Sequence, residues 1–419
     1  MPNHSQHLES TQIAITGMGL VSPLGNSLDL ALARARRGES GIRAYTAEWG
    51  DERHPQLRQR VGGTVEDFDP APLLDPRLAT RHEPAVLYAL AAAHEALTRA
   101  DLLGALDPER SGCVVGSGLP GAELWHRALH TSPVPRMTAV AITGNAAAGQ
   151  LALRHGLRGP SFGLANACAS GSTAIAVAMD QLRLGRADLM LVGGCESSMR
   201  GLMTYASFID AGMHATTDPR AACSPFAAAR RGFVLAEGAA MLVLERLDRA
   251  RARGARVWGV LAGAAISNDA YHVISPDPTG EAWARTMRLA LAEAGVRTDE
   301  VDAISAHATG TPLGDLAETR AIHRVFGPRA GQIPVTASKS MHGHAFGAAG
   351  ALELALAVAA MADDVVLPTI NLHTRDPECD LDYVPHVSRP HPTRVLLKNS
   401  FGASGAATCL VIRRDPQAA

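Results

Sequence analysis

The sequence lacks an excess of charge of either sign. Its 419 residues include 39 Lys and Arg against 41 Asp and Glu, which gives a formal net charge of −2. The basic residues are scattered, and we interpret their one local cluster as a solvated helix end: Arg249, Arg251, Arg253 and Arg256. This charge balance gives no reason to expect a nucleic-acid partner.

The sequence also lacks a long uninterrupted hydrophobic run. The longest apolar stretch, residues 346–361, is broken by Glu353 and is rich in Ala and Gly, which predicts a buried helix and not a membrane span. Residues 1–11 are polar and contain no apolar core of a secretory signal. We therefore expect a cytoplasmic protein without a membrane segment.

Two patterns built on cysteine and glycine are missing as well. The six cysteines, at positions 113, 168, 195, 223, 379 and 409, form no Cys-x-x-Cys pair and show no disulfide-like spacing, which predicts reduced thiols. Gly17 and Gly19 follow the apolar run at residues 12–16, but the third glycine of a dinucleotide-binding loop is absent. We therefore do not expect NAD to bind.

What the sequence does contain is enough apolar residues, 47%, for a large core, in a chain too long for one small domain. Apolar runs that predict strands alternate with periodic segments that predict helices. In the first half we expect strands at residues 112–118, 187–194, 233–238 and 240–244, helices at 84–100 and 145–153, and a surface excursion at 42–74. In the second half we expect strands at residues 257–265, 301–306, 335–339, 394–398 and 407–413 and helices at 281–294, 316–325 and 346–361.

The order of these elements is similar in the two halves of the chain. This repetition predicts an α/β protein with two pseudo-duplicated halves, residues 12–256 and 257–415.

Cys168 stands out within the first half. It lies between a short predicted edge strand at residues 161–165 and a helical pattern that ends at Gly185. The positive end of a helix dipole favours the thiolate, which is the form that attacks a carbonyl, and Gly171 leaves room for a substrate. The alternative is a buried structural cysteine, because a free cysteine also packs as a small hydrophobe.

Three predicted strand ends in the second half carry groups that a thiol nucleophile needs. His307 follows one strand, Lys339 with His342 and His344 follows the next, and residues 399–402 follow a third. Ligands of doubly wound sheets bind outside the carboxyl ends of strands, so these groups are expected to converge on one site. One histidine at a strand end is usually a satisfied polar residue, but three such ends and one thiol favour catalysis.

The same segments together resemble the elongating β-ketoacyl-acyl-carrier-protein synthases. The resemblance covers residues 13–413 and rests on residues 15–19 with 22–25, 167–171, 232–238, the His307 loop, 339–344 with 347–350, and 399–402. It implies the thiolase fold, in which two α/β halves form a layered αβαβα core. It also implies an acyltransferase whose substrates are carried on the phosphopantetheine of an acyl carrier protein, with no metal or redox cofactor.

The resemblance assigns the chemistry to four residues. It makes Cys168 the acyl-accepting nucleophile and the backbone N–H groups of Cys168 and Phe401 the oxyanion hole. His307 and His344 become the pair that promotes decarboxylation of the malonyl substrate. Two neutral imidazoles can donate hydrogen bonds to the thioester oxygen as enolate charge develops there.

The resemblance also implies supporting residues. Lys339 would form a buried charge network with Asp315, Glu318 and Glu353, and we interpret these carboxylates as structural because a buried lysine needs such partners. The residues expected to contact the substrate are the hydroxyls of Thr309 and Thr311 along the phosphopantetheine arm, Leu119 in the acyl pocket, and Gly402 in a loop that gates this pocket.

Several positions depart from the pattern of these synthases. Ala308 stands where glycine is common, His342 where threonine is common, and residues 403–407 replace a usual Gly-Thr-Asn segment after Phe401-Gly402. Residues 121–137 also form a shorter segment than is typical. These departures leave open whether the pathway is fatty acid or type II polyketide synthesis.

Three alternatives remain to be weighed. A degradative thiolase would need a second reactive cysteine, and Cys379 and Cys409 lie in unsuitable contexts. The second is a ketosynthase-like partner subunit or an acyltransferase of a heterodimeric polyketide system. Partner subunits lack the nucleophile, whereas this sequence has Cys168. A metal pair at His342 and His344 is the third, but it has no third ligand motif nearby. The resemblance implies a homodimer or a heterodimer with a paralogue, because the sheet core continues across the interface.

Overall fold

The computed structural model describes residues 12–46, 59–130, 133–134, 136–201, 204, 207–208, 213, 218–220 and 222–417. Ten strands form the main sheet: β1 (Ile13–Val21), β4 (Ser111–Gly116), β5 (Ser161–Leu164), β6 (Leu189–Glu196), β7 (Gly238–Arg246), β8 (Gly259–Asn268), β9 (Ala303–Ser305), β10 (Val335–Thr336), β13 (Val395–Phe401) and β14 (Ala406–Arg413). Their order is β10-β9-β13-β14-β8-β1-β7-β6-β4-β5.

The strand order repeats on either side of the β1–β8 pair. One side reads β1-β7-β6-β4-β5 and the other reads β8-β14-β13-β9-β10, so equivalent strands occupy equivalent places. Within each side the outer three strands are parallel and the next strand is antiparallel to them. The expected pseudo-duplicated α/β architecture is thus confirmed, while the boundary between residues 256 and 257 stays a prediction.

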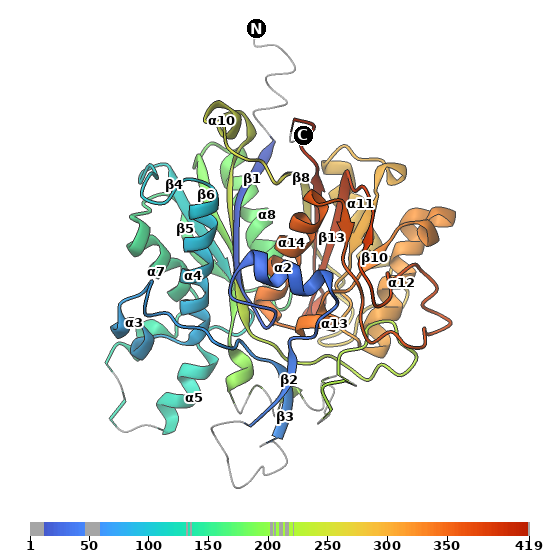
Figure 1. Ribbon diagram of the computed structural model, residues 1–419, viewed down its shortest axis with the longest axis horizontal. Coiled ribbons are helices and arrows are strands. Elements are labelled where there is room, and N and C mark those ends of the chain that lie inside the picture. The colour runs from blue at the N-terminus through green and yellow to red at the C-terminus, as the bar shows by residue number, and fades with distance from the viewer. Residues whose placement is uncertain are drawn as a thin grey trace.

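Helices cover the outer faces of the two five-stranded halves of the sheet and also lie between these halves (Figure 1). The helices are α2 (Leu28–Arg36), α3 (Pro76–Arg81), α4 (Pro84–Arg99), α5 (Ala122–His130), α6 (Thr138–Ala141), α7 (Ala146–His155), α8 (Ser170–Arg183), α10 (Leu247–Ala252), α11 (Glu281–Glu293), α12 (Pro312–Phe326), α13 (Lys339–His342) and α14 (Phe346–Ala362). α4 packs on β1 and β7, α11 packs on β8 and β14, and α8 and α14 pack on each other between the two sides. This is the layered αβαβα arrangement.

α14 is buried along nearly its whole length, as its sequence predicts. Residues from Phe346 to Leu356 are all buried, including Glu353. A helix enclosed by sheet on two sides needs apolar residues all round, which explains the missing polar face. Among the described residues, none of the helices has the length and apolar character needed to cross a bilayer.

The segment at residues 42–74 differs from the expected surface excursion. It contains a hairpin-like pair, β2 (Ile42–Thr46) and β3 (Gln59–Gly63), and its residues Ile42, Val61 and Val65 are buried. Residues 233–237 also differ, because Phe233, Leu235 and Ala236 form isolated bridges and the strand β7 begins only at Gly238. A further small sheet joins β11 (Val365–Val366) to β12 (Arg389–Pro390). Residues 1–11 and parts of 121–137 lie outside the described residues.

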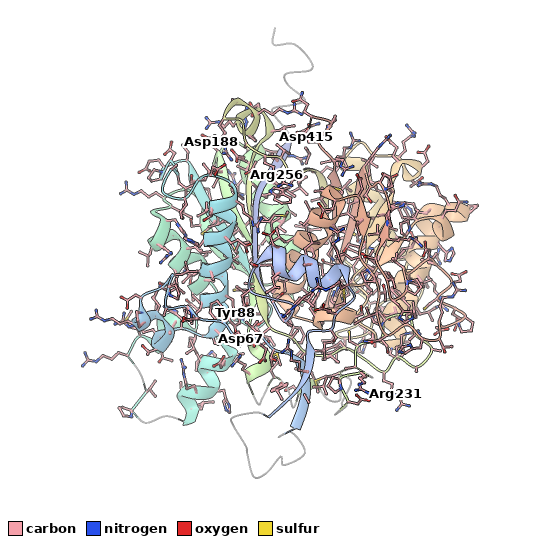
Figure 2. The ribbon with its side chains drawn as sticks, in the orientation of Figure 1. Asp67, Tyr88, Asp188, Arg231, Arg256 and Asp415 are labelled. Carbon is pink, nitrogen blue, oxygen red and sulfur yellow. The ribbon has the colours of Figure 1, made fainter. Side chains whose placement is uncertain are left out.

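The local basic cluster lies at the upper edge of the molecule in Figure 2, near the labelled Asp188 and Asp415. Arg249, Arg251 and Arg253 are ion-paired with Asp188, Asp415 and Glu245, respectively. Arg256 lies 3.6 Å from the centre of the Trp258 ring. These contacts agree with a structural surface cluster.

Candidate active site

Cys168 lies in the turn that joins β5 to α8. Ala167 adopts the left-handed region with φ 47°. Ser170 closes the turn, because its hydroxyl accepts from the N–H of Asn166 at 2.8 Å and donates to the carbonyl of Ala167 at 2.6 Å. α8 begins at Ser170, so the predicted place of the cysteine beside a helix start is confirmed.

The surroundings of Cys168 nevertheless favour the protonated thiol. Cys168 is half-buried, whereas the other five cysteines are buried. Removal from water raises the pKa of the Cys168 thiol to about 12, and the charge of Lys339 opposes this rise without cancelling it. Desolvation therefore opposes the thiolate more strongly than the helix terminus favours it, because a helix terminus contributes only about 0.3–1 kcal/mol.

The end of β13 lies against the backbone of Cys168. A Cβ atom added at Gly402 would lie 3.0 Å from the nitrogen of Cys168 and 3.2 Å from the Cβ atom of Ala167. Glycine therefore permits this close approach, which places the backbone of Phe401 beside the nucleophile. The ring of Phe401 is fixed by stacking on Trp283, with ring centres 4.0 Å apart and planes within 6°. This arrangement brings together the two residues of the expected oxyanion hole.

His307 and His344 lie side by side, as expected. Their ring centres are 5.5 Å apart and their planes meet at 83°. Burial, reinforced by the charge of Lys339, lowers the pKa of both imidazoles well below the usual range, so both are neutral near pH 7. Neither ring nitrogen of His344 has a hydrogen-bond partner within the described part of the chain. A buried imidazole with free nitrogens is poised to bind an oxygen that develops charge.

A buried group of three charges lies behind the histidines. Glu353 pairs with Lys339 at 2.5 Å and with Lys398 at 2.7 Å, and all three side chains are almost fully buried. Burial by itself would raise the pKa of Glu353, but the two ammonium groups outweigh it and lower the pKa. Lys339 also donates to the carbonyl of His307 at 2.5 Å. The group therefore fixes the backbone that carries His307.

Contrary to expectation, Asp315 and Glu318 do not belong to the charge network around Lys339. They bind other parts of the site. Glu318 accepts hydrogen bonds from the backbone N–H groups of His307 at 2.9 Å and Ala308 at 2.8 Å. Ala308 has φ 37°, a left-handed conformation that explains why glycine is common at this position. Glu318 thus holds the His307 loop in this conformation.

Asp315 is paired with an arginine and not with a lysine. It lies 3.8 Å from Arg230 and accepts from the N–H groups of Phe226 at 2.8 Å and Gly310 at 3.0 Å. Burial raises the pKa of Asp315 to about 7, while these hydrogen bonds and the arginine act in the opposite direction. The expected single network is therefore two groups, because α12 directs Asp315 and Glu318 at the loop before it.

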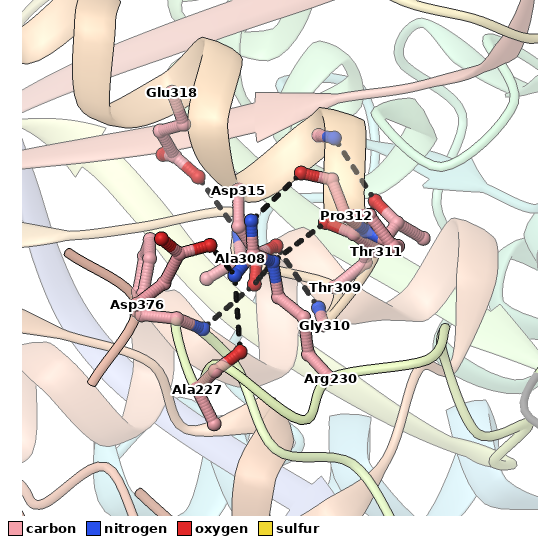
Figure 3. Close-up of polar contacts among 12 residues, drawn as sticks. Ala227, Arg230, Ala308, Thr309, Gly310, Thr311, Pro312, Asp315, Glu318 and Asp376 are labelled. Carbon is pink, nitrogen blue, oxygen red and sulfur yellow. Dashed lines mark hydrogen bonds and ion pairs between the residues drawn. The ribbon is translucent and has the colours of Figure 1, made fainter. Parts of the chain in front are cut away.

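Thr309 and Thr311 occupy one loop, with their hydroxyl oxygens 3.1 Å apart. Thr311 caps α12 by accepting from the N–H of Gly314. Arg230 holds this loop from the other side, because its guanidinium donates to the carbonyls of Thr311 at 3.3 Å and Pro312 at 2.9 Å and pairs with Asp376 at 2.6 Å (Figure 3). The two hydroxyls are thus presented from a rigid loop.

An apolar cluster adjoins Cys168. It consists of buried Met199, Met213, Phe233, Leu235 and Phe346, with Tyr45, Cys168 and Phe208 partly buried against it. Leu119 is 37% exposed, and its loop is held by Glu196, which accepts from the N–H groups of Gly118 at 2.8 Å and Leu119 at 3.3 Å. The cluster supplies an apolar wall at the thiol.

The loop after Phe401, residues 402–405, is held by hydrogen bonds. The N–H of Ser404 donates to the carbonyl of Val273 at 2.8 Å, and Asn268 donates to the carbonyl of Ser404 at 2.7 Å. Ala403 is exposed. Polar contacts to the segment at residues 268–273 therefore hold the loop without an aromatic ring at position 403.

His342 differs from His344 in its surroundings. Its Nε2 atom lies 3.2 Å from the hydroxyl of Ser338, and burial lowers its pKa to about 4. Within the residues that the structure describes, no three His, Cys, Asp or Glu side chains are grouped as a metal site would require.

Sequence reasoning missed several residues of this site. Lys398 is the last residue of the predicted strand at residues 394–398 and lies inside the observed strand β13. A lysine within a strand of buried residues could have signalled a buried charge. Trp283 and Arg230 gave no local signal, because their roles depend on partners distant in the sequence.

Comparison with known proteins gives consistent matches along the chain. Residues 10–250 match the β-ketoacyl synthase N-terminal domain, and residues 258–373 match the C-terminal domain. A 3-oxoacyl-[acyl-carrier-protein] synthase 2 of Synechocystis is 37% identical over 97% of this chain and 99% of its own. A type II polyketide ketosynthase solved with its acyl-carrier protein and a hexaketide has 32% identity and a TM-score of 0.88, covering 96% of this chain and 99% of its own. The ishigamide ketosynthase/chain length factor has 30% identity and a TM-score of 0.86, with the same coverage.

Proposed function

Because the chain belongs to the β-ketoacyl synthase family, we propose that it condenses an acyl thioester with a malonyl thioester, with loss of CO₂. Both substrates are carried on the phosphopantetheine of an acyl carrier protein, as the names of its relatives suggest. The observation that carries this proposal is that the end of β13 joins a half-buried thiol to two neutral imidazoles. Gly402 lies against the backbone of Cys168, and the ring centre of His307 lies 5.9 Å from that of Phe401 and 5.5 Å from that of His344.

In the first half-reaction the acyl group moves to Cys168. The sulfur forms a bond to the acyl carbonyl carbon, the bond from that carbon to the carrier sulfur breaks, and the thiol proton of Cys168 leaves with the carrier thiol. The backbone N–H groups of Cys168 and Phe401 stabilise the oxyanion between these two events. The raised pKa of Cys168 means that proton loss accompanies the attack and does not precede it.

In the second half-reaction the malonyl group loses CO₂ and its enolate attacks the acyl-cysteine. His307 and His344 stabilise the enolate oxygen as neutral hydrogen-bond donors. The new carbon–carbon bond forms, the bond to sulfur breaks, and the β-ketoacyl product stays on the carrier. Cys168 leaves as a thiolate and takes up one proton from water, which regenerates the thiol. The nucleophile and the hydrogen-bond donors come from the chain, so we propose that the reaction needs no metal or redox cofactor.

We further propose a cytoplasmic dimer. β5 lies at the end of the sheet order and is partly exposed, so its free edge can pair with the same strand of a second subunit. The second subunit is either a copy of this chain or a ketosynthase-like paralogue. Light scattering on the purified protein distinguishes them, because a homodimer has twice the chain mass of 43.8 kDa and a chain that awaits a paralogue does not.

The central test is the intact mass of the protein after incubation with a panel of acyl-carrier thioesters. We expect the mass to rise by one acyl group, and Cys168→Ala to abolish the rise while the fold is kept, because the substitution removes little volume. Cys113→Ala is the matched control, since Cys113 is buried in β4 and should not affect acylation.

Two outcomes would contradict the proposal. If acylation persists in Cys168→Ala, Cys168 is not the nucleophile. Acylation of the wild type without any condensation on malonyl-carrier would favour a simple acyltransferase. The acyl group that loads fastest separates the two pathways, because fatty acid synthesis uses straight reduced chains and polyketide synthesis uses ketoacyl chains.

A further inference from the structure

The backbone of Arg231 is held beside the loop that carries Thr309 and Thr311. The residue before it, Arg230, donates to the carbonyls of Thr311 and Pro312. The residue after it, Gly232, donates from its N–H to the carbonyl of Gly310 at 2.9 Å. Arg231 is thus fixed between two attachment points to this loop.

The side chain of Arg231 is directed differently from that of its neighbour. Arg230 is buried and its charge is compensated by Asp376 and Asp315. Arg231 is exposed, and within the described part of the chain it has no ion-pair or hydrogen-bond partner. Figure 2 shows Arg231 at the lower edge of the molecule, whereas Asp188, which directly precedes β6, lies at the upper edge. Arg231 therefore lies toward the edge of the sheet that contains Glu196, the carboxyl end of β6.

We infer that Arg231 binds the phosphodiester of the phosphopantetheine arm as the arm enters the site. This inference rests on the proposed function, because it needs a carrier-borne substrate. The hydroxyls of Thr309 and Thr311 can bind the neutral amide part of the arm but cannot neutralise its phosphate. A guanidinium presents paired N–H donors that match a phosphate, and an exposed arginine without a partner is free to do so.

A carboxylate of the carrier protein is a second anion that Arg231 can bind at the same edge. The phosphodiester is favoured because Arg231 is attached to the loop of the arm-binding hydroxyls and not to a separate surface element. The two sources differ in a testable way, since free phosphopantetheine has the phosphate but no carrier surface.

The test measures kcat/KM for acylation of Cys168 by one acyl group on three thiols: pantetheine, phosphopantetheine and the carrier protein. The quantity of interest is the ratio of the phosphopantetheine value to the pantetheine value, because effects on the fold cancel in it. We expect Arg231→Ala to lower this ratio roughly tenfold, the scale of one charge-assisted contact at an exposed site. Arg231→Lys should restore part of it, because the charge is kept and the fork is lost.

Arg256→Ala is the matched control, since Arg256 is an exposed arginine at the opposite edge that lies on Trp258. Its ratio should equal that of the wild type. An unchanged ratio in Arg231→Ala, with normal acylation of the wild type, would overturn this inference alone. If Arg231→Ala lowers kcat/KM only for the carrier-protein thioester, then Arg231 binds a carboxylate of the carrier protein and not the phosphate. Failure of all three thioesters to acylate the wild type would overturn the proposed function and this inference with it.

Discussion

Removing the charge of Glu353 tests the buried group behind the histidines most directly. Glu353→Gln keeps the shape of the side chain but leaves Lys339 and Lys398, both almost fully buried, without their shared counter-ion. Breaking a buried ion pair from one side costs about 3–5 kcal/mol, because an uncompensated charge remains away from water. We therefore expect a clear loss of stability from a substitution that changes almost no volume.

The loss converts into a modest shift of the melting temperature, because the chain is long. At about 2.1 cal/mol/K per residue, the 419 residues give an unfolding entropy of about 0.9 kcal/mol/K. The expected decrease in Tm is therefore roughly 3–6 °C, measured by differential scanning calorimetry. A Tm indistinguishable from that of the wild type would refute the argument.

A double-mutant cycle with Lys398→Met provides the control. Once one ammonium is gone, Glu353→Gln leaves only one buried cation uncompensated, so its further cost should be smaller by about 0.5–3 kcal/mol. Purely additive losses in the two variants would show that the three charges do not act as a group.

The pH dependence has a definite sign. The pKa of Glu353 is lowered in the folded protein, so its carboxylate contributes stability that is fully present above the unfolded-state value of 4.5 and is lost as pH falls through the lower folded value. The gap in Tm between wild type and Glu353→Gln should therefore persist near pH 6 and narrow only below about pH 4.5. A gap that closes already between about pH 7 and 6 would point to a histidine instead.

Three further predictions concern the chemistry and the loops. His307→Ala and His344→Ala should still accept the acyl group but lose malonyl decarboxylation by about 10²-fold or more; failure of acyl transfer with normal decarboxylation would reverse these roles. Ala308→Gly should leave the fold stable or raise its stability by up to about 1 kcal/mol, because it relieves a left-handed alanine; a large loss in chemical denaturation would contradict this. Ala403→Phe should lower, and Leu119→Ala should raise, the ratio of long-chain to short-chain acylation, and unchanged ratios would exclude loop and pocket control of chain length.

The sequence by itself determined the local features of this protein. The thiol before a helix, the apolar strands and the repeated order of elements depend on neighbours within about ten residues, where periodicity and turn residues decide the structure. The positions of Cys168, His307 and His344 at the ends of elements therefore follow from the sequence alone, and the resemblance added their roles.

Only the tertiary structure decided how the charged groups pair. Asp315 pairs with Arg230 and not with Lys339, and Glu353 pairs with Lys398 in addition to Lys339. It also decided that burial keeps the Cys168 thiol protonated against the helix dipole. The physical reason is the same in each case: desolvation and ion pairing depend on which atoms lie within a few ångströms, and those atoms come from segments far apart in the chain.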